Sequence, residues 1–129
     1  MSMFKNTKNE LTAEEKEQLE KKKAEWQKLI AIYLNAEIRS KNTAIDNATW
    51  NINFTKQRRK DFFDEYGVKA ITPKHFKEVQ KYTIDILYNR YILKSSTEAL
   101  KKLNNGDISE LEECEPLQKR IKEIDKSLQ

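Results

Sequence analysis

The chain has one histidine and one cysteine, His75 and Cys114, and these are the first side chains to consider for chemistry. His75 is expected in the first turn of a helix that begins at Pro73, where a neutral, exposed histidine is common. Cys114 lies between Glu113 and Glu115, and neighbouring carboxylates disfavour the thiolate that a nucleophile requires. We therefore expect no catalytic residue and no enzyme activity.

Metal and cofactor sites need patterns that this sequence lacks. One His and one Cys cannot supply the usual ligands of a zinc site. With two Gly in the whole chain, there is no glycine-rich loop for a phosphate or a dinucleotide. The glutamates of 110–115 lack the spacing and the glycine of an EF-hand, so we interpret them as a solvated acidic turn. No cofactor and no metal ligand is expected.

A shortage of turn residues predicts a helical chain. The 129 residues include two Gly and two Pro, whereas a β-rich chain of this size needs several times more turn residues. We predict an all-α fold, with three to four long helices in an elongated antiparallel bundle that has coiled-coil-like segments. After a flexible tail at 1–11, residues 12–129 are expected to form a single helical domain. The helices are expected at about 13–40, 44–66, 73–103 and 116–128.

Local signals mark several of these helix ends. Thr12 and Glu15 have the spacing of a capping box, in which each side chain accepts a hydrogen bond from the other residue's backbone N–H. Gly67 is expected to end the second helix as its C′ glycine. Thr72 and Pro73 predict the start of the next helix, with Thr72 as the N-cap and Pro73 at the first helical position.

Two features of the first half stay open. Trp50, Ile52 and Phe54 alternate with asparagines, which is a strand pattern, but no hairpin turn lies nearby and we prefer a helix over 49–55. A second helix start at Thr43 divides the first two helices. Alternatively, they form one continuous rod with a kink near 40–43.

The predicted helix at 73–103 has apolar residues on two sides. On a helical wheel its main stripe consists of Phe76, Val79, Thr83, Ile86, Leu87 and Leu93. Ile84, Tyr88, Tyr91 and Ile92 occupy the other side. Such a helix is either central to its own bundle or half-covered by a partner. A heptad of Val79, Ile86, Leu93 and Leu100 also exists, but its companion positions are too polar for a clean coiled coil, namely Tyr82, Asn89, Ser96 and Leu103.

Excess apolar surface favours a partner over a reaction. Trp50 and Phe54 also point away from the main stripe of their helix, and aromatic residues are enriched in interface cores. We predict a non-catalytic helical interaction subunit or adaptor of an intracellular multiprotein assembly, which binds another protein or a second copy of the chain. The predicted partner-binding residues are Trp50, Phe54, Tyr88, Tyr91 and Ile92.

Nucleic-acid binding is the alternative hypothesis, because the middle of the chain is basic. Residues 39–102 hold fourteen Lys and Arg against seven acidic residues. The outline resembles a helix-turn-helix, although the link at 67–72 is longer than usual and no residue suited to bidentate base contacts comes before Gln80. Backbone contacts to DNA or RNA would come from Arg58, Arg59, Lys60, Lys74, Lys77 and Lys81.

The expected location is intracellular, either cytoplasmic or nuclear. The first residues are polar, without the apolar run of a signal peptide. No stretch approaches the roughly 18 apolar residues of a membrane helix. A lone cysteine allows no intrachain disulfide, which fits a reducing compartment.

Overall fold

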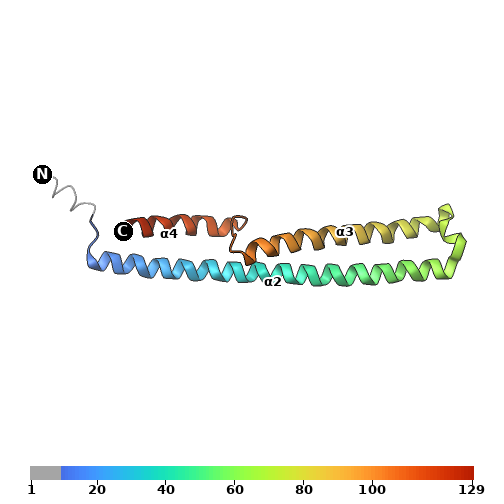
Figure 1. The fold of residues 1–129 in the computed structure, drawn as a ribbon, viewed down its shortest axis with the longest axis horizontal. Helices are drawn as coiled ribbons and strands as arrows, with labels where there is room; N and C mark the ends of the chain where they lie inside the picture. The colour runs from blue at the N-terminus through green and yellow to red at the C-terminus, as the bar shows by residue number, and fades with distance from the viewer. Residues whose placement is uncertain (1–9) are drawn as a thin grey trace. The chain divides into compact units, whose positions relative to one another are not determined.

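The chain is all-α in a computed structural model, which describes residues 10–129 (Figure 1). The described part has two long helices, α2 at Ala13–Tyr66 and α3 at Pro73–Asn104, and one shorter helix, α4 at Glu115–Leu128. The all-α prediction is confirmed. The predicted bundle of three to four long helices is not, because two of these three helices are long.

Short 3-10 helices precede α3 and α4. They are η1 at Gly67–Ile71 and η2 at Glu112–Cys114. None of the helices described within 10–129 is long and apolar enough to cross a membrane. Most of the predicted tail at 1–11 lies outside the described residues.

Helix α2 passes through 40–43 and 49–55 without a break, so the structure has the continuous helix of the second alternative. The alternating residues fit a helix because Trp50 and Phe54 are one turn apart and share a side. Ile52 lies on the opposite side and is buried.

The capping box at the start of α2 is confirmed. The backbone N–H of Thr12 donates to Glu15 Oε1 and the backbone N–H of Glu15 donates to Thr12 Oγ1, each at 3.1 Å. Gly67 follows α2 with a φ of 56°, which is the left-handed conformation expected of a C′ glycine. Thr72 is the N-cap residue of α3 and Pro73 its first residue, as predicted, but the side chain of Thr72 makes no capping bond to α3. Its hydroxyl donates instead to the carbonyl oxygen of Lys69 at 2.6 Å, and so closes η1 rather than capping α3.

The chain groups into two compact units. Unit 1 comprises residues 1–36 and 108–129, and unit 2 comprises 37–107. The single domain expected over 12–129 stays a prediction.

In unit 1, α4 runs beside the first half of α2 (Figure 1). Lys23 of α2 forms an ion pair with Asp125 of α4. Ile124 is buried in this contact, and the segment before α4 buries Ile108 and Leu111.

In unit 2, α3 packs antiparallel to the second half of α2. Asn51 bonds to Asn89 and Thr55 bonds to Asp85, so residue numbers rise along one helix as they fall along the other. We call this contact the seam. Its buried residues are Ala48, Ile52, Thr55, Val79, Ile86, Asn89, Ser96 and Leu103.

The seam uses the heptad that appeared too polar in the sequence. Along α3 the buried and half-buried positions recur at alternating intervals of four and three residues, from Val79 to Leu103. Asn89 is accommodated there because its amide Nδ2 donates to the backbone carbonyl of Asp85 at 2.8 Å, while its Oδ1 accepts from Asn51.

Candidate partner-binding surface

Four large apolar side chains of α3 are more than half exposed. Ile84 is 66% exposed, Leu87 56%, Tyr88 63% and Tyr91 70%. Their spacing of i, i+3, i+4 and i+7 places them side by side on a helix. We call this set the outer face of α3. It lies about 180° from the seam residues around Ile86 and Asn89 on the helical wheel.

The outer face is exposed because unit 2 offers α3 a single long neighbour. Helix α2 covers the seam side of α3, and η1 contacts the start of α3. Burying a large apolar side chain contributes about 1.5–3 kcal/mol, and these four side chains gain only part of that within the chain.

A second aromatic group lies on α2. The rings of Trp50 and Phe54 stack with centroids 4.8 Å apart and an angle of 11° between their planes. The guanidinium of Arg58 lies 5.6 Å from the Phe54 ring and 6.0 Å from the Tyr82 ring of α3. Trp50 is 62% exposed and Phe54 46%. This stack thus presents a flat aromatic surface to solvent.

The stack borders a groove between α2 and α3 in unit 2. The groove encloses about 500 Å³, and its wall on the α3 side includes Lys81 and Asp85. Tyr88 and Ile92 follow Asp85 by three and seven residues, so they continue the same side of α3. The remaining lining residues are Trp50, Asn51, Phe54, Thr55, Arg58, Glu78 and Tyr82.

Polar contacts beneath the groove fix the register of the two helices. The hydroxyl of Thr55 donates to the carboxylate of Asp85 at 2.8 Å. One turn further along α2, the guanidinium of Arg59 donates to the hydroxyl of Thr83 at 3.2 Å. Because each bond joins one particular residue of α2 to one of α3, a shifted pairing would break both bonds.

Four of the five predicted partner-binding residues are exposed: Trp50, Phe54, Tyr88 and Tyr91. Ile92 is half-buried, since it follows the buried Asn89 by three residues and so flanks the seam.

The prediction that Leu87 belongs to the main apolar stripe of α3 with Ile86 is wrong, because Leu87 is exposed. The buried positions of α3 repeat every 3.5 residues on average, so they drift relative to a straight stripe at 100° per residue. Leu87 is therefore carried to the exposed side. Ile86 occupies a heptad position and Leu87 does not, so counting the heptad intervals along the sequence could have identified Leu87 as exposed.

The basic residues of the alternative hypothesis do not form one surface. Arg58, Arg59 and Lys60 are consecutive, so they point about 100° apart. Arg59 is half-buried and bonded to Thr83, and Arg58 lies over the ring of Phe54. Lys74, Lys77 and Lys81 share one side of α3, within about 60° of each other. Of these three, Lys81 forms an ion pair with Glu78 at 3.2 Å.

His75 packs at the end of the helical hairpin. Its ring centroid lies 4.6 Å from that of Tyr66. Its Nδ1 lies 3.2 Å from the hydroxyl of Thr72, which already donates its proton to Lys69. The hydroxyl must therefore accept from a protonated Nδ1, and His75 acts as a hydrogen-bond donor within the turn.

Cys114 is fully buried as a free thiol. Burial and the neighbouring carboxylate of Glu113 raise its pKa, so the reactive thiolate is disfavoured. Among residues 10–129, no cluster of three or more His, Cys, Asp or Glu side chains has the geometry to hold a metal ion.

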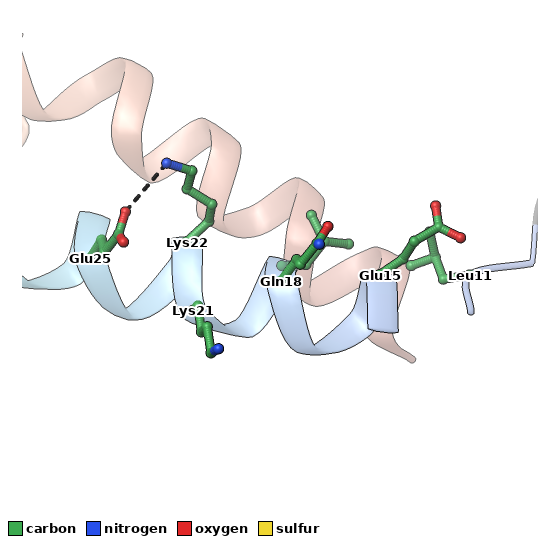
Figure 2. A pocket seen from close by; sticks show the side chains of 7 residues that line it. Leu11, Glu15, Gln18, Lys21, Lys22 and Glu25 are labelled. Carbon is green, nitrogen blue, oxygen red and sulfur yellow. Dashed lines mark hydrogen bonds and ion pairs between the residues drawn. The ribbon is translucent and has the colours of Figure 1, made fainter. Parts of the chain in front are cut away.

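A second hollow lies along the first turns of α2 in unit 1 and encloses about 440 Å³ (Figure 2). Leu11 and Glu15 lie at one end, and Lys22 reaches Glu25 at 3.4 Å at the other. Lys21 points away from that pair and lies 3.7 Å from Glu17. The charged groups at this end are thus matched with each other, one helical turn apart.

Taken together, the surface of unit 2 offers apolar and aromatic contact area with charged edges. Tyr88, Tyr91 and Trp50 present rings to solvent, a property typical of residues that anchor protein–protein contacts.

Comparison of the chain with protein-family models, with curated proteins and with solved structures found no match.

Proposed function

We propose that this chain is a non-catalytic subunit or adaptor that binds another protein through the outer face of α3. The observation that supports this proposal is the exposure of Ile84, Leu87, Tyr88 and Tyr91 on one side of one helix. A contiguous apolar patch costs free energy in water and is typical of an interaction site.

The proposed mechanism is burial of Tyr88 and Tyr91 at the centre of the contact. Tyrosine supplies a large apolar ring and a hydroxyl that can find a polar partner, with little rotamer entropy to lose. Trp50 and Phe54 provide a second contact point on α2, already held in place by their mutual stacking.

An intracellular assembly is the proposed setting. Cys114 is a buried free thiol, and proteins of oxidising compartments more often pair their cysteines.

The test compares full-length chains purified through a tag from their native cells. Tyr88→Ser combined with Tyr91→Ser is expected to lower recovery of the bound protein about tenfold, because two anchors are lost. Glu20→Ser combined with Lys28→Ser, both exposed positions of α2 in unit 1, serves as the matched control and keeps the partner. Equal recovery by both double variants, with unchanged circular dichroism, would contradict the proposal.

Nucleic-acid binding stays a second candidate because Lys74, Lys77 and Lys81 share one side of α3. Backbone binding would show a steep fall in affinity for DNA or RNA with rising salt. Replacing the three lysines by Ala would reduce that salt slope. Absence of binding at low salt would remove this candidate.

A further inference from the structure

The outer face of α3 has a rim of positive charge. Lys77 and Lys81 precede Ile84 by seven and three residues, while Arg90 and Lys94 follow Leu87 by three and seven residues. These intervals place each of them next to the apolar patch on the helix. All four side chains belong to exposed residues.

Three of these four cations form no ion pair in the described part of the chain. They are Lys77, Arg90 and Lys94, whereas Lys81 pairs with Glu78. That pair is more than 40% exposed on both sides, so it is weak and easily exchanged for a new partner.

The acidic residues of this stretch of α3 lie on the groove side, next to Lys81 and further than Lys81 from the centre of the outer face on the helical wheel. Between 77 and 94 they are Glu78 and Asp85, and both line the groove on the α2 side. Asp85 also accepts the hydrogen bond from Thr55. The outer face therefore presents apolar side chains with a cationic border.

The spacing of the patch is that of a surface which packs against one helix. Residues at i, i+3, i+4 and i+7 form a single stripe along α3, about two turns long, matching the a and d stripe of a second helix.

A second copy of the chain fits less well. In a twofold pair through this face, both copies would bring the same four cations, Lys77, Lys81, Arg90 and Lys94, to one contact. Like charges gathered at one contact destabilise it.

We propose that the outer face of α3 binds an amphipathic helix whose apolar stripe is flanked by Asp and Glu. This inference rests on the proposed function and specifies its partner. The acidic flanks would lie opposite four cations, Lys77, Lys81, Arg90 and Lys94. Such charge complementarity increases the association rate and the specificity for the partner more than it increases the affinity.

The test uses two synthetic peptides that are stapled into helices. Both have Leu at heptad positions a and d, and they differ in having Glu or Lys at e and g. Binding to the full chain is measured by fluorescence anisotropy at low and high salt. The Glu peptide is expected to bind about tenfold tighter than the Lys peptide at low salt, with the difference shrinking as salt screens the charges.

Charge-reversal variants of the chain sharpen the test. Lys81→Glu combined with Lys94→Glu is expected to reverse the preference to the Lys peptide. Lys56→Glu combined with Lys60→Glu makes the same charge change at exposed positions of α2 and is expected to keep the preference for the Glu peptide.

Three kinds of result would overturn the inference. Equal binding of both peptides, lost in the Tyr88→Ser and Tyr91→Ser variant, rejects acidic flanks but leaves the proposed function standing. Self-association of the chain that the same two substitutions abolish makes a second copy the occupant. Failure of both peptides to bind rejects the helical acidic partner, and the purification from native cells then decides the proposed function separately.

Discussion

Asn89 shows how one polar residue is used inside the seam. It is 5% exposed, at a heptad position where an apolar residue would pack better. Its amide satisfies both of its bonding groups, through Asp85 and Asn51. A buried polar residue of this kind fixes register and partner choice at a cost in stability.

Replacing Asn89 by Leu is therefore expected to stabilise unit 2 by about 1 kcal/mol and to loosen its pairing specificity. Urea unfolding followed by circular dichroism measures the first effect, and sedimentation velocity detects the oligomers expected from the second. A less stable monomer would mean that the Asn51–Asn89 bond contributes more than the packing it displaces.

Cys114 gives a prediction about reactivity. Burial and the carboxylate of Glu113 raise the pKa of this thiol. We therefore expect the native thiol to react with a disulfide reagent about tenfold more slowly, or slower still, than the thiol of the urea-unfolded chain. Equal rates in the two states would show that the segment before α4 opens freely.

The same shift has a consequence for stability. The pKa of Cys114 is higher in the folded chain than in the unfolded chain. The neutral thiol therefore contributes fully to the free energy of unfolding at pH values below the ordinary thiol pKa, and this contribution is lost as pH rises through the folded pKa. Cys114→Ser is expected to flatten the fall in unfolding free energy at alkaline pH. An unchanged alkaline profile in this variant would assign the fall to other groups.

At the scale of helices, α3 separates a buried side from an exposed one within three residues. Ile86 is 2% exposed in the seam, and Ile84 is 66% exposed on the outer face. Because both residues are isoleucines, the same substitution at each position compares a buried site with an exposed site on one helix.

Ile86→Ala is expected to cost about 2–5 kcal/mol of unfolding free energy, while Ile84→Ala is expected to stay within about 0.5 kcal/mol. Urea denaturation of the two variants checks this. A comparable loss at Ile84 would mean that the outer face is already covered in the free chain.

The start of α2 depends on its capping box. Thr12→Ala removes the acceptor for the backbone N–H of Glu15 and is expected to cost about 1 kcal/mol locally. Hydrogen exchange of the Glu15 amide is expected to speed up, while exchange at Ile52 in the seam is unchanged. An unaltered rate at Glu15 would show that the first turn holds without its cap.

Short-range rules predicted the helical content, the capping box and the left-handed Gly67, because each depends on neighbours in sequence. They did not decide the continuity of α2, because Thr43 has the local chemistry of a start while the contact stripe runs on through it. The same rules placed Leu87 wrongly, because the exposure of a residue on α3 depends on which side of α3 packs against α2. Tyr88 and Tyr91 could be recognised because they lie on the side of the helical wheel that holds the lysines, whereas Leu87 falls at the edge of the main apolar stripe.

At the scale of the whole molecule, charge is divided between the two units. Unit 2 holds fourteen Lys and Arg against nine acidic residues, and unit 1 holds eleven against twelve. The net charge of +4 therefore comes from the unit that carries the outer face. Association through that face is expected to weaken with salt. The fold of the seam is expected to change less, because it is built on apolar contacts and short-range hydrogen bonds between α2 and α3.

We expect the outer face of α3 to be covered by another protein in the cell. The most direct test places a photo-crosslinking residue at Tyr91, at Ile84 or, as a control, at Glu20 of the full-length chain in its native cells. An adduct with the same protein is expected from positions 91 and 84, and none is expected from position 20. Absence of any adduct at 84 and 91 in a correctly folded chain, or equal adducts at position 20, would contradict it.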